Sequence, residues 1–372
     1  MFKAVAGYYK DNERLRLWVK IIAVWLISRA VMLLMVPVMN LIADEPHQWL
    51  YYMNPWDAEW YKGIVENGYQ PPKSSGMASW AFFPLYPLVC MAVRLVTMGS
   101  IDTYAVGMTV SNICIIIAVY YAVKYADIEL DMKKYNKKTV EDIIIFLMLA
   151  GPFAVYYGAM YTEALFILCV ILCFYNSARH NYMAAGIAAA MASATRIVGC
   201  MLVFVLITYM FMETCAECRA KHNSEMKDNK EAGIIDKCML TEEAGILIAG
   251  NISLASVIRT FIKNVIKEPK KLVAIMISPL GIFIYMNYLR YFCGDSWAFY
   301  HVQRAWRTQK MFPVIGVLFK SCTGQLSAAS GVKTLNGIIL GWLCVITLML
   351  YAAMIRNCLL YTSPSPRDMR RS

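Results

Sequence analysis

Long apolar runs alternate with short polar segments along nearly the whole chain. The runs cover residues 17–42, 81–98, 104–125, 143–178, 182–212, 272–292 and 337–355. A bilayer core of about 30 Å is crossed by roughly 20 apolar residues in a helix. A helix also satisfies its own backbone hydrogen bonds, which lipid cannot do. The pattern therefore predicts an all-α polytopic membrane protein.

Two of these runs carry internal features that change the picture. The run at 143–178 is interrupted at Gly151–Pro152 and again at the polar residues 161–163, so it predicts two helices with an irregular centre. Non-helical backbone at membrane depth is tolerated only where protein or a water-filled cavity covers it. The run at 182–212 begins with small residues, which predict close helix packing.

Composition and charge agree with a membrane protein. Hydrophobic residues make up 59% of the chain and charged residues only 16%, which is more apolar than a soluble domain requires. The net charge of +11 arises from Lys and Arg at the ends of apolar runs, so it reflects membrane topology and does not indicate nucleic-acid binding.

The distribution of these basic residues predicts which segments face the cytoplasm. The N-terminus and residues 133–138 are rich in Lys or Arg and are expected to be cytoplasmic, with residues 43–80 on the outer face. Two complete spans at 81–98 and 104–125 would contradict this arrangement. Either the run at 81–98 is re-entrant or slanted, or the loop at 133–138 breaks the charge rule.

These assignments predict one membrane domain over residues 1–357. It contains an outer loop at about 43–80, a cytoplasmic insertion at about 213–271 and a second outer loop at about 294–336. Within the insertion, a weakly amphipathic segment near 252–266 is expected to lie on the inner leaflet.

The last residues, 358–372, resemble the translated read-through of a sequencing adapter. We expect them to be non-native, with further C-terminal spans missing from the chain. The alternative is an ordinary disordered basic tail.

Residues 54–69 form a polar and aromatic island within the first outer loop. Asn54 can cap a helix, Pro55 suits the first helical position, and Gly68 can end the helix in a left-handed conformation. The segment therefore predicts a helix over 55–67, too short to span a bilayer.

Asp57 is the candidate catalytic residue of this helix. Asp57 and Tyr61 are spaced to share one face, with Trp56 and Trp60 beside them. A carboxylate framed by aromatic rings suits sugar and phosphate chemistry. Alternatively, Asp57 complements the helix dipole and the aromatic residues form an interfacial belt.

Ionisable residues within the apolar runs are functional candidates because they are costly in a membrane. Glu163 and Arg196 lie deepest, in successive runs, and Arg29 lies in the first run. Glu163 and Arg196 either pair with each other, or Arg196 holds a lipid-linked phosphate, which suits a guanidinium fork. A transporter or lipid flippase is a rival function that these charges and the broken runs also favour.

The late outer loop carries His301, Gln303 and Arg304 among several aromatic residues. Such a surface can bind a phosphate and stack on a sugar, or it can serve as an interfacial anchor. A non-catalytic membrane subunit that stabilises a partner enzyme is the third candidate function.

Several reaction classes find no support in the sequence. No phosphate-binding GxxxxGK[ST], zinc-binding HExxH, esterase GxSxG, deaminase or DxD pattern is present. Cys215 and Cys218, with His222 and Cys238 downstream, resemble a zinc site only loosely. We therefore expect no metal and no cofactor.

Five segments in order resemble the PIG-V type mannosyltransferases, which add the second mannose in GPI-anchor assembly, and their bacterial relatives. These segments are 56–64 with Gly68 and Tyr69, 82–87, 161–166, 192–196, and 292–299 with Gln303 and Trp306. The resemblance covers about residues 20–310. The charged insertion at 213–271 departs from the family pattern.

The resemblance implies a GT-C fold, a multi-span helical bundle with a catalytic first outer loop. The implied donor is a polyprenyl- or dolichyl-phosphate sugar, and the implied acceptor is a glycolipid or glycan. Asp57 would act as base in an inverting displacement, and Arg196 and Arg304 would stabilise the leaving phosphate. Trp56, Trp60, Tyr61, Glu163, His301 and Gln303 complete the expected substrate site. The expected location is the plasma membrane of a bacterium or the endoplasmic reticulum of a eukaryote.

Overall fold

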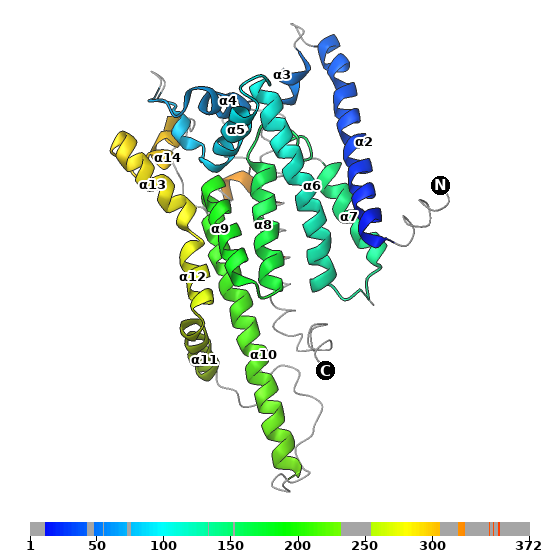
Figure 1. Ribbon diagram of the computed structural model, residues 1–372, viewed down its shortest axis with the longest axis vertical. Coiled ribbons are helices and arrows are strands. Elements are labelled where there is room, and N and C mark those ends of the chain that lie inside the picture. Colours follow the sequence, from blue (N-terminus) through cyan, green and yellow to red (C-terminus); the bar gives the residue numbers. More distant parts are fainter. Residues whose placement is uncertain are drawn as a thin grey trace. The chain divides into compact units, whose positions relative to one another are not determined.

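The computed structural model describes residues 12–42, 48–54, 56–72, 76–132, 134–151, 153–231, 254–305 and 319–323, and the single positions 342, 345 and 349. Every regular element within these residues is a helix (Figure 1). Two compact units can be distinguished, the first at residues 1–221 and 253–305, the second at 222–252 and 306–372. The first unit contains all the packing described below.

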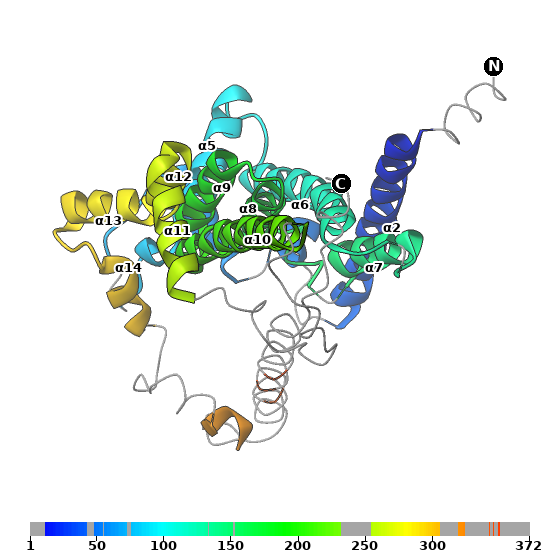
Figure 2. The same ribbon diagram turned by 90° about the horizontal axis from the view of Figure 1, so that it is seen from below.

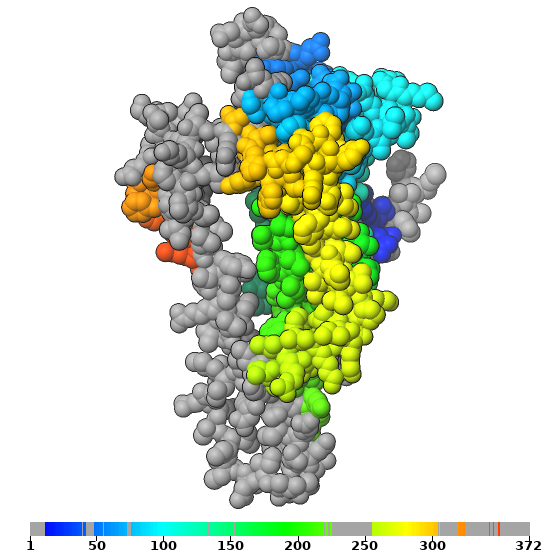
Figure 3. All heavy atoms as spheres, turned by 90° about the vertical axis from the view of Figure 1, so that its left-hand side faces the viewer, coloured from blue at the N-terminus to red at the C-terminus, as the bar shows by residue number. Residues whose placement is uncertain are grey.

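A row of packed helices forms the centre of the first unit. Helix α6 (Thr103–Glu129) packs along α8 (Glu163–Ala178), which packs along α9 (Tyr182–Thr195). Helices α12 (Pro269–Ile277) and α13 (Leu280–Cys293) cover the other side of α9. Figure 2 shows α6, α8, α9 and α12 side by side, and Figure 3 shows α11 (Leu254–Lys267), α12 and α13 in succession along one face.

Small residues bring α9 close to its neighbours, as its sequence predicts. A Cβ added at Gly186 would lie 2.7 Å from the Ala274 carbonyl oxygen of α12, and one at Gly281 would lie 2.3 Å from the Ala190 carbonyl oxygen. No side chain fits at either distance, so both positions require glycine for the observed packing.

Three described helices are long and apolar enough to span a bilayer, which agrees with a polytopic membrane protein. They are Glu13–Val38 within α2 (Glu13–Ile42), all of α6, and Ile197–Cys218, which includes the first part of α10 (Leu202–Glu231). Helices α12 and α13 together form a fourth candidate span, bent by 43°. The run predicted at 272–292 is therefore broken near Ser278–Pro279 rather than straight.

Helix α5 (Leu85–Val96) is too short to cross the bilayer. Its 12 residues extend about 18 Å. Together with α3 (Trp49–Met53) and α4 (Ala58–Asn67), it lies at the end of the bundle where α2 finishes and α6 begins (Figure 1). The re-entrant or slanted alternative for residues 81–98 is thus the one that the structure favours.

Ion pairs join the elements at the opposite end of the bundle. Lys137, at the start of α7 (Lys137–Leu149), pairs with Glu13 at the start of α2, and Lys20 pairs with Asp142. The basic N-terminal end and the lysine-rich loop therefore lie on the same side, and both lie away from α4.

The irregular centre predicted for residues 143–178 is confirmed. Helix α7 ends at Leu149, α8 begins at Glu163, and residues 153–162 form successive turns. By contrast, the apolar run at 182–212 hides a reversal of direction. Helix α9 ends at Thr195, and a short 3-10 helix η2 (Ile197–Met201) leads into α10. A Cβ at Gly199 would lie 2.2 Å from the Ala192 carbonyl carbon, so glycine permits this tight return.

The predicted insertion is only partly described. Its beginning is helical, because α10 continues to Glu231, and its end is the amphipathic α11, in which Val257 and Val265 are buried while Arg259 and Lys263 are exposed. Residues 232–253, most of the second outer loop, most of the run at 337–355 and the tail at 358–372 lie outside the described residues. The domain boundaries remain predictions.

Candidate active site

Helix α4 begins at Ala58, three residues later than predicted, and Asp57 takes the N-cap position. The prediction that Asn54 caps this helix is wrong. Its Oδ1 atom instead accepts a hydrogen bond of 2.7 Å from the Met160 amide, and its Nδ2 donates to the Leu50 carbonyl at 2.8 Å. Because Met160 is buried, its amide needs a partner, and Asn54 supplies one from a distant part of the sequence.

Residues with positive φ stand before the start of α4 and at its end. Gly68 has φ 70° and ψ −172°, a conformation essentially restricted to glycine, and its amide donates to the Ile64 carbonyl at 2.9 Å. Trp56 has φ 52°, which is rare for a bulky residue. Its side chain is 75% exposed. Strained backbone of this kind is typical of functional sites.

The Asp57 carboxylate remains accessible to solvent and makes no capping hydrogen bond. Its backbone amide donates to the Tyr161 hydroxyl at 3.2 Å. Partial loss of hydration raises the pKa of Asp57 above its ordinary value of 3.8, the negative charge of Glu163 raises it further, and the positive charge of Arg196 lowers it. These three charged residues, from distant parts of the sequence, therefore share one electrostatic environment.

Glu163 and Arg196 form an ion pair, which confirms one of the two alternatives for these residues. The Nη1 atom of Arg196 donates to Oε1 of Glu163 at 2.7 Å. The Arg196 side chain is nevertheless 42% exposed. The second carboxylate oxygen, Oε2 of Glu163, is buried and has no hydrogen-bond partner among the described residues. A buried acceptor without a donor is costly unless a ligand or water supplies one.

The aromatic residues of α4 differ in their surroundings. Tyr61 is buried, with its hydroxyl 3.4 Å from the Thr162 hydroxyl. Trp60 stacks on Phe82 with ring centroids 5.7 Å apart. These two rings fix α4 in the protein. Trp56 also stacks, on Tyr156 with ring centroids 6.5 Å apart, but at 75% exposure the rest of its ring is open to a ligand.

Tyr161 is the functional candidate that the sequence interpretation missed. It belongs to a motif that the sequence shows, yet its hydroxyl contacts Asp57 only through the fold. Aromatic residues that flank a carboxylate across a turn give no periodic signal in the sequence.

The family described as Mannosyltransferase (PIG-V) matches residues 12–235, which is more than half of the chain. The matched region includes Asp57, Glu163 and Arg196. The chain belongs to the PIG-V mannosyltransferase family. It is accordingly an integral membrane glycosyltransferase that takes a sugar donor and a glycan or glycolipid acceptor. Searches of curated proteins and of solved structures gave no match.

The late loop of this PIG-V family member lies beyond the matched region. It contains α14 (Ala298–His301) and a 3-10 helix η3 (Val302–Ala305), both in contact with η1 (Ser79–Ala81). Phe299 packs against Phe83 with ring centroids 5.3 Å apart.

The expected ligands of this loop are differently placed. His301 Nδ1 lies 2.6 Å from Asp295 Oδ2, and this hydrogen bond lowers the pKa of Asp295. Gln303 is half-buried in η3. The Arg304 side chain lies outside the described residues, so its role as a phosphate ligand stays a prediction.

No group of three His, Cys, Asp or Glu residues in the described part of the chain is arranged to hold a metal. Cys215 and Cys218 lie on α10, whereas Cys238 and the His222 side chain are outside that part. The described site is thus one of carboxylates, one guanidinium and aromatic hydroxyls.

Proposed function

We propose that this PIG-V family member transfers mannose from a polyprenyl- or dolichyl-phosphate donor to a hydroxyl group of a glycolipid or glycan on the outer face of the membrane. The observation that carries the proposal is a chain of contacts: the Asp57 amide bonds the hydroxyl of Tyr161, two residues before Glu163, and Glu163 pairs with Arg196. Helix α4, whose N-cap is Asp57, lies at the end of the bundle opposite the start of α2 (Figure 1). A GT-C architecture is part of this proposal.

Asp57 acts as the general base in the proposed mechanism. It takes the proton of the acceptor hydroxyl as that oxygen forms a bond to the anomeric carbon. The bond between the anomeric carbon and the phosphate oxygen breaks, and its electron pair leaves with the lipid phosphate. Attack from the side opposite the phosphate inverts the anomeric configuration. A raised carboxyl pKa suits this role, because a stronger base accepts the proton more readily.

Arg196 supplies the positive charge for the leaving phosphate. Its exposed guanidinium retains donors beyond the one that Glu163 engages. A guanidinium is suited to phosphate because its N–H groups match two phosphate oxygens. Pairing with Glu163 keeps the guanidinium oriented before the substrate binds, which reduces the cost of ordering it.

Glu163 and Trp56 bind the sugar in this scheme. The Oε2 atom of Glu163, which has no hydrogen-bond partner among the described residues, accepts a hydrogen bond from a sugar hydroxyl. The exposed Trp56 ring offers a flat apolar surface for the sugar face. Tyr61 and Trp60 hold α4 in place, and His301 and Gln303 contribute from the late loop when the acceptor binds.

The test uses the purified protein in proteoliposomes with polyprenyl-phospho-mannose and a panel of glycolipid acceptors. The expected result is a mannosylated lipid whose new linkage has the anomeric configuration opposite to that of the donor, measured by NMR. Transfer with retention would overturn the inverting mechanism. Movement of the donor across the bilayer without any covalent product would favour the flippase alternative.

A further inference from the structure

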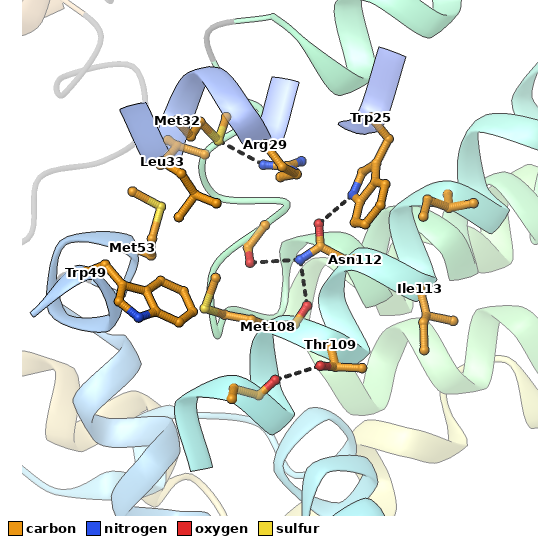
Figure 4. Close-up of a pocket in the computed structure, with 14 residues that line it drawn as sticks. Trp25, Arg29, Met32, Leu33, Trp49, Met53, Met108, Thr109, Asn112 and Ile113 are labelled. Atoms are coloured by element: carbon orange, nitrogen blue, oxygen red, sulfur yellow. Dashed lines mark hydrogen bonds between the residues drawn. The ribbon is translucent and has the colours of Figure 1, made fainter. Parts of the chain in front are cut away.

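A cavity of about 380 Å³ lies between α2, α3 and α6 (Figure 4). It shares the irregular segment 153–162 with the candidate active site. Val155 and Gly158 of this segment line the cavity, whereas Tyr161 reaches Asp57. The volume falls within the range of roughly 300–1,000 Å³ that small-molecule sites occupy.

The cavity wall is almost entirely apolar. Trp49 and Met53 come from α3, Met108 from α6, and Leu33 from α2, as Figure 4 shows. Leu33 is 46% exposed, on a helix long and apolar enough to span the bilayer. Methionine and tryptophan side chains form an adaptable surface for a hydrocarbon chain.

Arg29 is the charged exception in this wall. Its Nη1 atom donates to the Ala154 carbonyl at 2.9 Å and lies 3.0 Å from the Met32 sulfur. Its Nε and Nη2 atoms are buried and have no hydrogen-bond partner among the described residues. None of the 14 residues that line the cavity is an Asp or Glu. A desolvated guanidinium that has no acidic partner among the described residues is costly, and a bound anion would offset this cost.

Contacts along α6 relate the cavity to the candidate active site. The Asn112 side chain donates to the Gly158 carbonyl at 3.2 Å, and Gly158 lies directly against the Arg29 guanidinium. Asn112 is nine residues from the start of α6, or about 13 Å along a helix of about 40 Å. Its neighbour Ser111 bonds the Tyr161 carbonyl, so the cavity and the candidate active site lie at similar depth.

We propose that this cavity binds an anionic phospholipid of the bilayer. One acyl chain lies against the apolar wall, and the phosphate lies beside the guanidinium of Arg29, the positively charged residue among the described residues that line the cavity. The proposal does not depend on the identity of the sugar donor.

The segment 153–162 contacts Arg29 through Ala154 and Asp57 through Tyr161, which favours a phospholipid over the donor as the occupant. Asn54 holds this segment through the Met160 amide at 2.7 Å, and Asn112 holds it through the Gly158 carbonyl. A lipid phosphate at Arg29 would therefore be separated from Asp57 by fixed backbone. The bound phospholipid instead stabilises the segment that contains Tyr161. It does so through Arg29, which donates a hydrogen bond to the Ala154 carbonyl of that segment.

Native mass spectrometry of the full chain, exchanged into vesicles of equal phosphatidylglycerol and phosphatidylcholine and then purified, tests the proposal. We expect the wild-type protein to retain phosphatidylglycerol selectively. Arg29→Gln removes a charged hydrogen-bonding group and should reduce this retention by about 10-fold or more. Arg290→Gln is the matched control, because Arg290 is an exposed arginine in the last turn of α13. This variant should retain as much phosphatidylglycerol as the wild-type protein.

Two further measurements test lipid binding if Arg29→Gln does not fold. Ile113→Trp narrows the cavity while Arg29 remains, and it should also reduce retention. In the delipidated wild type, phosphatidylglycerol should raise Tm in a saturable manner and phosphatidylcholine should not.

Three results would overturn the proposal. One is equal retention of the two lipids by the wild type. Another is unchanged retention in a folded Arg29→Gln protein. The third is exclusive retention of a polyprenyl phosphate, tested by adding it to the same vesicles.

Discussion

Asp57 combines chemical reactivity with a cost to the fold. Its raised pKa means that the folded chain binds the proton more tightly than the unfolded chain, so ionisation opposes folding. This penalty is absent at pH values well below 3.8, where both states are protonated, and complete above the raised folded-state pKa. At neutral pH the ionised Asp57 therefore lowers the free energy of unfolding, as is expected of a residue kept for function.

The substitution Asp57→Asn separates these two effects. Loss of a general base should lower kcat by about 10²–10⁴-fold, while Tm at neutral pH stays equal or rises because the ionisation penalty disappears. Mannosyl transfer and thermal unfolding measure the two effects on one preparation. Glu59→Gln is the control, since Glu59 is an exposed acid in the same turn whose carboxylate bonds Tyr104, and it should retain near wild-type kcat. A large fall in Tm for Asp57→Asn would indicate a structural role instead.

The pH dependence of the reaction should report the same carboxyl. A general base must be deprotonated to act. We therefore expect kcat/KM to fall at acidic pH, with the midpoint of this acid limb above 3.8 because the pKa of Asp57 is raised. Glu163→Gln removes a negative charge that raises the Asp57 pKa and leaves Arg196 uncompensated, so the limb should move to lower pH. If the acid limb does not move in Glu163→Gln, the charge of Glu163 does not influence the pKa of Asp57.

Residue types alone predicted part of this site. Glu163 and Arg196 stand out because ionisable groups are rare in apolar runs, and Asp57 stands out by its aromatic neighbours and the family resemblance. The roles of Asn54 and Tyr161 depend on contacts across more than 100 positions, Asn54 with Met160 and Tyr161 with Asp57. Local spacing therefore misassigned Asn54 as a helix cap, since capping is its commonest local role.

At the scale of elements, the glycines of α9 and α13 decide how closely the helices approach. Gly281→Ala places a Cβ 2.3 Å from the Ala190 carbonyl oxygen, a backbone atom that cannot rotate away. We expect destabilisation of about 1–3 kcal/mol, seen as a lower Tm in detergent. Gly63→Ala is the control, because no atom lies within 4 Å of the added Cβ and alanine favours a helix, so its Tm should be unchanged or higher. Equal effects of the two substitutions would contradict this account of the packing.

Hydrophobic periodicity reports the existence of helices better than their direction. The break within 143–178 was predictable because Gly, Pro and three polar residues interrupt the apolar run. The reversal at Arg196 was not, because residues on both sides of it are apolar and Gly199 reads as one more small residue. The close approach of Gly199 to Ala192 exists only once the chain has turned back.

At the scale of the whole molecule, the short helix α5 removes the conflict between hydropathy and charge. Two apolar runs, 81–98 and 104–125, lie between an outer loop and a lysine-rich loop. The length of a run does not show whether its helix spans the membrane when the ends of the helix are uncertain from sequence. With α5 confined to one end, only α6 crosses between these loops. The all-α membrane architecture was thus predictable from composition and run length, whereas this topology required packing of α5 against α4 and α6.

This topology predicts that both ends of α5 lie on the same side of the membrane. Gln70 and Ser100 are exposed residues before and after α5, and Lys138 is an exposed residue beyond α6. In a background without native cysteines, Gln70→Cys and Ser100→Cys should react with an impermeant maleimide from the same side, and Lys138→Cys only from the other. Permeabilised membranes provide the control, because all three positions should then react.

Labelling of Gln70→Cys and Ser100→Cys from opposite sides would mean that residues 81–98 span the bilayer. The lysine-rich loop would then face outward with the N-terminus inside, which the contact between Lys137 and Glu13 at one end of the bundle opposes.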